Sequence, residues 1–223
     1  MSRKFKILDP CGYSEFKVFD YKQYTIKDNA ITCLVGCNGA GKTTLFKQMQ
    51  QQLDKLDIPY AEHLATKAKD QLSYAAFTLG NMEAIGYFGY SNWASEGEGI
   101  ARRFQYLAQD LGYYVGTTCK DQSEGWIFLD SLDSGCSIDN IDEIVDFLQN
   151  TVMKDKPENL NLHIIIAVNS YAFIDNDYVD CLDVTTGKHV KFNSYEEYRN
   201  FIRTTKELKD SRVQYEDEDD EDE

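Results

Sequence analysis

The chain has 223 residues, of which 42% are hydrophobic and 13% are aromatic. This length predicts about one domain, and such a share of core-forming side chains excludes an intrinsically disordered protein. Acidic residues outnumber basic ones by 38 to 23, and residues 216–223 are all acidic, which leaves 30 acidic residues in the rest of the chain. This balance excludes a broadly cationic nucleic-acid binder, because non-specific affinity for duplex phosphates comes from basic side chains. It leaves open direct nucleic-acid binding through a local basic patch.

All apolar runs are shorter than the roughly 18 residues that a membrane helix needs, and no apolar core of a signal peptide follows the first residues. We therefore expect no membrane span and a cytoplasmic location. The six cysteines are scattered and include no C-x-x-C pair. This spacing indicates reduced structural thiols rather than a disulfide framework or a zinc site.

The first elements expected along the chain are two antiparallel strands, at Phe5–Leu8 and Phe16–Tyr24, which are rich in aromatic and β-branched residues. Residues Ala30–Val35 form a continuous apolar run of strand length. A glycine cluster follows it, and apolar residues then recur at helical spacing from Leu45 to Leu56. This order predicts a buried strand, a glycine-rich loop and a helix.

The middle of the chain is less regular. Ile58–Tyr60 is compatible with a short strand, and the stretch Gly80–Trp93, rich in glycine and aromatic residues, is compatible with a loop. Apolar residues from Ile100 to Leu111 then fall on one face of a helix, which we expect to begin near Glu98.

Two further buried strands are expected in the second half, at Trp126–Leu129 and Leu162–Val168, with an amphipathic helix between them from Ile138 to Leu148. Buried strands that alternate with helices are typical of an α/β fold with a mainly parallel sheet.

The C-terminal part begins with a predicted hairpin, in which Cys181–Val184 and His189–Phe192 flank the turn sequence T-T-G-K. Ser194 and Glu197 then form a capping box for a helix that we expect to run to about Lys209. The acidic composition beyond it predicts a disordered tail, because a polyanion repels itself and cannot build a core.

The glycine cluster after the first long buried strand matches the pattern G-x-x-x-x-G-K-[ST] in full. In such a loop, backbone N–H groups turn inward around phosphate oxygens, and the lysine reaches the β- and γ-phosphates. The N-terminus of the following helix adds partial positive charge. We therefore predict a site for ATP and Mg²⁺ formed by Gly36, Asn38, Gly39, Ala40, Gly41, Lys42, Thr43 and Thr44.

Asp130 ends the strand segment W-I-F-L-D, so a parallel sheet would place its carboxylate beside the glycine-rich loop. A carboxylate at that position holds Mg²⁺ together with the hydroxyl of Thr43, and both residues are predicted metal ligands. The alternative is that Asp130 only caps a turn or a helix.

Three further segments follow the glycine-rich loop: Ser95-Glu96-Gly97-Glu98 before a helix, the heptapeptide L-D-S-L-D-S-G after the second buried strand, and Asn169-Ser170 after the third. In this order they resemble the signature, Walker B with D-loop, and switch segments of the ABC-type ATPases, over roughly residues 5–170. The run G-C-N-G-A-G-K-T-T-L is also similar to that family. The resemblance implies a P-loop fold of ABC type, with an N-terminal antiparallel β portion and a small helical lobe at about 60–115.

The glutamate that ends the signature segment resembles that of DNA-repair and chromosome-structure ATPases more than that of transporters. Over nearly the whole chain, the sequence resembles small stand-alone ATP-binding proteins found in phage genomes, which share the S-E-G-E element and the ending T-G-K-H-V-K-F-N-S-Y-E-E-Y-R-N-F-I. This resemblance implies one nucleotide-binding domain at 1–209, a tail at 210–223 and a location in the host cytoplasm.

Carried over to this chain, the signature residues of the family are Ser95 and Gly97, which would contact the γ-phosphate bound by a facing subunit. The resemblance therefore implies a head-to-tail homodimer that buries two ATP molecules between its subunits. A helix N-terminus that bears a small hydroxyl also suits a γ-phosphate on physical grounds. Taken alone, Ser95 is more often a simple helix N-cap.

Two positions depart from active ABC-type ATPases. Ser131 stands where they carry a glutamate general base, and Asn169 stands where they carry a switch histidine. Both changes remove a group that polarises the attacking water, and a positioned acid or base contributes roughly 10²–10⁴ in rate. Slow hydrolysis, or binding without turnover, is therefore expected.

The catalytic candidates are thus Ser131, Asp133 and Asn169. Asp133 is a candidate replacement for the missing carboxylate, with a turn or helix cap as the alternative, and Asn169 is a candidate ligand of the γ-phosphate or of a water. Gln71 is the best choice for a Q-loop glutamine. Tyr13 is a candidate for stacking on adenine, although a core role suits it better.

The leading hypothesis is an ATP-binding protein whose ATP-driven dimerisation acts as a slow switch or scaffold in phage or DNA metabolism. A fully active ATPase motor working with a nuclease or membrane partner is the enzyme alternative. A small-molecule P-loop kinase is a third hypothesis, which is weakened by the signature and switch segments. The acidic tail is either a docking site for a basic protein partner or a solvating end.

Overall fold

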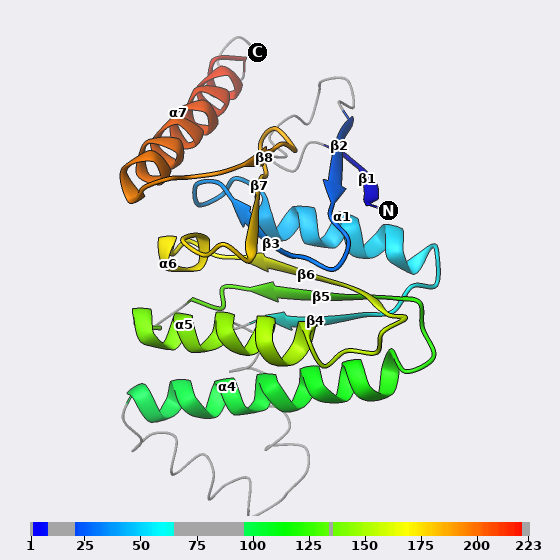
Figure 1. Ribbon diagram of the computed structural model, residues 1–223. Coiled ribbons are helices and arrows are strands. Elements are labelled where there is room, and N and C mark those ends of the chain that lie inside the picture. Colours follow the sequence, from blue (N-terminus) through cyan, green and yellow to red (C-terminus); the bar gives the residue numbers. More distant parts are fainter. Residues whose placement is uncertain (1, 9–20, 65–95, 134–135, 220–223) are drawn as a thin grey trace, which may run out of the picture.

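The computed structural model describes residues 2–8, 21–64, 96–133 and 136–219 of the chain. Its centre is a six-stranded sheet with the strand order β4-β5-β6-β3-β7-β8, in which all neighbours are parallel except the last pair (Figure 1). A separate antiparallel sheet contains β1 and β2. The strands are β1 (Arg3–Leu8), β2 (Tyr21–Ile26), β3 (Ile31–Val35), β4 (Tyr60–Leu64), β5 (Glu124–Asp130), β6 (Asn161–Ala167), β7 (Val179–Asp183) and β8 (His189–Val190).

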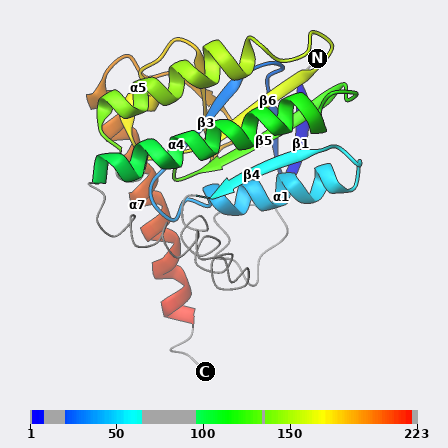
Figure 2. The ribbon, with the colours of Figure 1, turned by 90° about the horizontal axis from the view of Figure 1, so that it is seen from below.

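Helices cover both faces of the central sheet. The β1–β2 sheet and α1 lie on one face, and α4 and α5 lie on the other (Figures 1 and 2). Within the described ranges, no helix is both long enough and apolar enough to cross a membrane. The helices are α1 (Lys42–Asp54), α4 (Glu96–Tyr113), α5 (Ile138–Phe147), α6 (Tyr171–Ile174) and α7 (Tyr195–Asp219), and π-helical turns η1 (Tyr114–Thr118) and η2 (Leu148–Met153) extend α4 and α5.

The alternation of side chains along the central strands explains the two hydrophobic cores. Successive residues of a strand point to opposite faces of its sheet. In β5, Ile127 and Leu129 pack into the core shared with α4 and α5, whereas Trp126 and Phe128 pack into the core shared with α1. A strand buried on both faces therefore reads as a continuous apolar run, as predicted for this segment.

The structure confirms an α/β fold with a mostly parallel sheet, and it differs from the sequence-based expectations at several boundaries. The strand expected at Ile58–Tyr60 is β4, which begins at Tyr60 and pairs with β5. The expected start of the helical lobe, at about residue 60, is therefore too early, because residues 60–64 belong to the central sheet. Leu107 and Leu111, near the end of α4, also pack into the main core.

The C-terminal helix is longer than expected. It was predicted to stop at about Lys209 and to give way to a disordered tail from residue 210, but α7 continues to Asp219. No glycine or proline interrupts residues 195–219, so the sequence supplies no helix stop there. At its start, the Ser194 hydroxyl accepts a hydrogen bond from the Glu197 N–H at 3.3 Å, as the capping box requires, although the Glu197 carboxylate bonds the N–H of Asn193.

Candidate functional site

The site predicted from the sequence lies at the carboxyl edge of the sheet, where the parallel strands β3, β5 and β6 end. After the neighbouring strands β3 and β6, the chain continues on opposite faces of the central sheet. β3 continues into α1, whose Leu45 and Met49 belong to one core, and β6 continues towards α6, whose Phe173 belongs to the other. Such a switch point opens a crevice at the ends of the strands, which is the usual place for a ligand in an open α/β sheet.

The loop from Gly36 to Gly41 connects β3 to α1 in a conformation that needs its glycines. Gly36 has a φ of 155°, and a Cβ there would lie 3.0 Å from the Cβ of Ala40. Gly41 is the N-cap of α1 and has a φ of 94°, in the left-handed region. These positions let the loop fold tightly over the helix N-terminus, where N–H groups are available to an anion.

The remaining predicted residues of this segment differ in their exposure to solvent. Asn38 and Gly39 are exposed at the rim, and Ala40 is buried beneath them. Thr44 is exposed in the first turn of α1.

The Lys42 ammonium lies under the loop and bridges it to β6. It donates to the carbonyl oxygen of Gly36 at 2.9 Å, to that of Cys37 at 3.4 Å and to the side-chain oxygen of Asn169 at 3.0 Å. All three acceptors are neutral, and among the residues that the structure describes no carboxylate forms a direct ion pair with the ammonium. It is therefore placed to exchange these oxygens for those of a phosphate.

Partial burial lowers the pKa of Lys42 below its ordinary value, and the nearby carboxylates of Asp133 and Asp130 act in the opposite direction. The ordinary pKa of a lysine, near 10.4, lies well above neutral pH. The carboxylates thus help to keep a half-buried cation at the centre of the site.

Thr43 and Asp130 meet across the crevice, as predicted. The Thr43 hydroxyl donates to the Asp130 carboxylate at 2.8 Å. Hydroxyl and carboxylate oxygens are the hard ligands that Mg²⁺ prefers, and it completes its shell with phosphate oxygens and water. The pair therefore fits the magnesium site expected from the sequence.

Ser131 follows Asp130 in a constrained turn. It has a φ of 57°, its N–H donates to the carbonyl of Ala167 at 2.9 Å, and its hydroxyl donates to the second Asp130 carboxylate oxygen at 3.1 Å. The side chain thus orients Asp130. A serine hydroxyl has no basicity at neutral pH, so this position holds no general base.

Asp133 holds the loop that follows β6. One of its carboxylate oxygens accepts the N–H groups of Asn169, at 2.8 Å, and of Ser170, at 2.7 Å. This geometry fixes Asn169 with its amide oxygen on Lys42. The structure therefore gives Asp133 a positioning role in the turn, close to the capping alternative that the sequence left open.

Three residues of α7 also reach this edge, and no sequence pattern predicts them. The Tyr198 hydroxyl donates to the carbonyl of Asn169 at 3.0 Å, and Thr205 accepts the N–H of Cys37 at 3.1 Å. Lys209 donates to the carbonyl of Asn38 at 3.2 Å. Each contact joins segments far apart in the chain, which a local sequence pattern does not report.

A cavity of about 830 Å³ opens between the loop and α7. Gly36 and Asn169 form one side, Tyr195 and Arg203 line the other, and Asp142 of α5 also faces it. Such a volume suits a small-molecule ligand.

Several predicted residues cannot be placed in this geometry. Ser95, Gln71 and Tyr13 lie outside the described residues. Gly97 lies in the first turn of α4, which begins at Glu96, two residues before the expected start.

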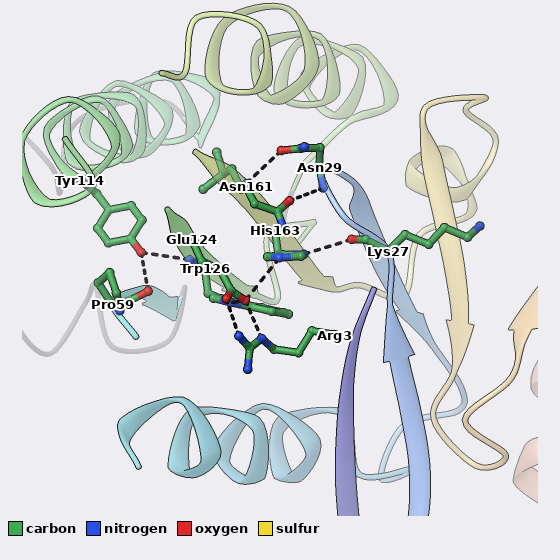
Figure 3. Close-up of polar contacts among 10 residues, drawn as sticks. Arg3, Lys27, Asn29, Pro59, Tyr114, Glu124, Trp126, Asn161 and His163 are labelled. Atoms are coloured by element: carbon green, nitrogen blue, oxygen red, sulfur yellow. Dashed lines mark hydrogen bonds and ion pairs between the residues drawn. The ribbon is translucent and has the colours of Figure 1, made fainter. Parts of the chain in front are cut away.

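A second polar cluster, the amino-edge cluster, lies at the opposite edge of the sheet and contains Arg3, Lys27, Glu124, Trp126 and His163 (Figure 3). The Arg3 guanidinium forms an ion pair with Glu124, and the indole N–H of Trp126 donates to the same carboxylate at 2.8 Å. The ring of His163 stacks on that of Trp126 with centroids 3.9 Å apart, and its Nδ1 lies 3.0 Å from the Lys27 carbonyl.

In the amino-edge cluster, burial and the neighbouring groups shift the pKa values in opposite directions. Burial lowers the pKa of His163, although the Lys27 carbonyl and the Glu124 carboxylate favour its protonated form. For Glu124, burial acts to raise the pKa, but the bonds from Arg3 and Trp126 outweigh it and lower the pKa overall. Most of these groups bond one another within the core, as expected for a structural cluster, whereas the His163 Nε2 has no hydrogen-bond partner among the described residues and lies 3.6 Å from the Glu124 carboxylate.

A scan of the chain against models of known protein families finds no match, and a search of well-characterised proteins finds none either. A functional assignment therefore depends on the residues and geometry of the carboxyl edge.

Proposed function

We propose that this protein binds ATP–Mg²⁺ at the carboxyl edge of its sheet and acts as a nucleotide-dependent switch or scaffold with slow hydrolysis. The observation that carries the proposal is the convergence of the Lys42 ammonium, the Thr43–Asp130 pair and the Asn169 amide around one glycine-rich loop. These groups are the cation, the metal ligands and the polar side chain that a bound triphosphate requires. A role in phage or DNA metabolism depends on the family resemblance alone.

Slow turnover follows from the groups beside the expected γ-phosphate. The Ser131 hydroxyl is bonded to Asp130, and the Asp133 carboxylate accepts two backbone N–H groups. A serine hydroxyl cannot take a proton from water at neutral pH, and the Asp133 carboxylate is engaged through one oxygen in holding the turn after β6. The chain's own residues would thus bind and orient the triphosphate, with Asn169 left to hold the attacking water, while the metal ion neutralises phosphate charge.

Dimerisation is the second part of the proposal. The amino end of α4, which carries Gly97 of the signature segment, belongs to the helical layer on the face opposite α1 (Figure 1). This separation of Gly97 from the loop within one chain supports a head-to-tail homodimer, in which the signature segment contacts the ATP of a second chain. The protein should then sediment as a heavier species with ATP–Mg²⁺ than with ADP, and Ser95→Arg should remove the difference.

The binding test is an ATP–Mg²⁺ titration of wild-type protein and of Lys42→Ala by calorimetry. Loss of the ammonium removes charge-assisted bonds to phosphate, and we expect affinity to fall by roughly 100-fold or more. Lys47→Ala is the matched control, because Lys47 is an exposed residue of the same helix. Equal ATP affinity in all three proteins would refute the proposed site.

A phosphotransferase for a small molecule is a second candidate, which the cavity of about 830 Å³ beside Gly36 and Asn169 favours. An acceptor in that cavity would lie next to the end of the phosphate chain. Phosphate release measured with and without candidate acceptors separates the two functions. A switch releases phosphate slowly whatever is added, whereas a kinase transfers it to an acceptor.

A further inference from the structure

The C-terminal helix brings a second lysine to the glycine-rich loop. The Lys209 ammonium donates to the Asn38 carbonyl at 3.2 Å and lies 3.5 Å from the position that a Cβ on Gly39 would occupy. Its side chain is only 23% exposed. The lysine is therefore held against the rim of the loop instead of extending into solvent, as most surface lysines do.

Within the described part of the chain, this charge has only a weak ion-pair partner. Among the residues that the structure describes, the one carboxylate paired with Lys209 is Asp210, at 3.7 Å and with a side chain that is 52% exposed. An ion pair so long and so exposed contributes little. The main partner of the ammonium is thus the dipole of one carbonyl group.

Lys209 and Lys42 hold successive carbonyls of the same segment. Lys42 binds those of Gly36 and Cys37, and Lys209 binds that of Asn38. Thr205, one turn before Lys209, accepts the Cys37 N–H, so α7 is fixed to the loop at two points. Two ammonium groups from distant parts of the chain therefore bind the backbone of the one loop that is expected to hold a phosphate chain.

The charge of the expected ligand matches this arrangement. A nucleoside triphosphate carries about four negative charges near neutral pH, and Mg²⁺ neutralises about two of them. Lys42 alone would leave one uncompensated, in a chain whose formal net charge is −15. A second cation beside the loop removes that deficit and raises the local attraction for an anion.

We propose that Lys209 is a second phosphate-binding lysine, supplied by α7 to the nucleotide site of its own chain. This inference rests on the proposed function. On binding, the ammonium would leave the Asn38 carbonyl for an oxygen of the terminal phosphates, a change that rotation of a lysine side chain allows. A merely structural lysine would instead stay on the carbonyl and be indifferent to the number of phosphates.

Phosphate-dependent affinity is the first test. We expect Lys209→Met, which keeps the apolar stem, to weaken ATP–Mg²⁺ binding by about 10-fold or more, ADP–Mg²⁺ binding less and AMP binding not at all. Lys209→Arg should stay within about 3-fold of wild type. Lys206→Met is the matched control, because Lys206 is an exposed lysine one turn earlier on α7. Unchanged ATP affinity in Lys209→Met, or an equal loss for all three nucleotides, would overturn the proposal.

Chemical labelling of the wild-type protein tests the same point without any substitution. Lysine amines are acetylated with and without ATP–Mg²⁺ and quantified by mass spectrometry. We expect the nucleotide to protect both Lys42 and Lys209, and to leave Lys206 unaffected. Protection of Lys42 without Lys209 would contradict the inference and leave the proposed function intact. Absence of protection at both lysines would refute the proposed function itself.

Discussion

The two edges of the central sheet use similar polar groups in opposite ways. At the amino edge, the rings of His163 and Trp126 are fully buried. The Glu124 carboxylate there contacts the side chains of Arg3, Trp126 and His163. At the carboxyl edge, Thr43 and Asn169 are exposed, and the partners of the Lys42 ammonium among the described residues are neutral oxygens. The first set is committed to the fold, and the second is available to a ligand.

This difference shows how to separate a structural polar cluster from a binding site. A buried polar group without a partner destabilises the folded state by about 1–3 kcal/mol. The polar groups of a structural cluster therefore mostly bond one another. A binding site keeps donors and acceptors that are weakly engaged until the ligand arrives, and other parts of the fold must supply its stability. Substitutions at the two edges should therefore act on different observables.

The largest effect is expected from Trp126→Ala at the amino edge. Trp126 packs edge-to-face on Phe5 and stacks on His163, so truncation should lower the free energy of unfolding by about 3–5 kcal/mol. Urea denaturation measures this loss, with Tyr178→Ala as the control because Tyr178 is 63% exposed. The ATP affinity of the folded variant should stay at the wild-type value. A lower ATP affinity would contradict the claim that the amino edge serves stability and the carboxyl edge serves binding.

A smaller loss of stability is expected from Thr205→Val, where α7 meets the loop. The change keeps the shape of the side chain but leaves the buried Cys37 N–H without its acceptor, at a cost of about 1–3 kcal/mol. ATP affinity should fall as well, because the loop loses a fixed point. The exposed neighbour Thr204, changed to valine, provides the control for both measurements. An effect on neither observable would show that α7 is not coupled to the loop.

The amino-edge cluster should also give the protein a pH dependence. An unfolded His163 takes up a proton near its ordinary pKa of 6.5, whereas burial lowers the pKa in the folded protein. The unfolded state therefore binds more protons as the pH falls below 6.5, and stability declines by at most about 1.4 kcal/mol per pH unit. Glu124, with its lowered pKa, adds a similar decline only below its ordinary value of 4.5.

His163→Gln should flatten the upper part of that curve. Denaturation midpoints measured between pH 7 and pH 5 would show the change, and the region below pH 4.5 should keep its slope. The same slope in both proteins would mean that the Lys27 carbonyl, Glu124 and Asp28 offset burial and Arg3, so that the pKa of His163 in the folded protein equals its ordinary value.

The smallest expected effect concerns turnover at the carboxyl edge. Ser131→Glu places a carboxylate where active ABC-type ATPases, which the sequence resembles, carry one, in a left-handed turn that serine already occupies without glycine's freedom. Phosphate release should rise by about 10-fold if Asn169 still holds the water in line. Brisk wild-type turnover that responds to Asp133→Asn, and not to Ser131→Glu, would instead place the base at Asp133.

Local patterns predicted the parts of the fold and the site that depend on neighbouring residues. The β3–loop–α1 unit, the strand that ends at Asp130 and the hairpin of β7 and β8 follow from apolar periodicity and turn residues. The meeting of Thr43 with Asp130 also followed, because parallel strands end at one edge. The buried contact of Thr205 with Cys37 did not, because no spacing rule links residues on a helix and a loop that meet only in the folded chain.

The most direct test of the account is a crystal structure of the protein with Mg²⁺ and a non-hydrolysable ATP analogue. We expect the phosphates inside the loop of residues 36–43, with the Lys42 ammonium on their oxygens and the metal ion between Thr43 and Asp130. An analogue bound elsewhere, with Lys42 still bonded to the Gly36 carbonyl and the Asn169 amide, would contradict the assignment of the carboxyl edge as a nucleotide site.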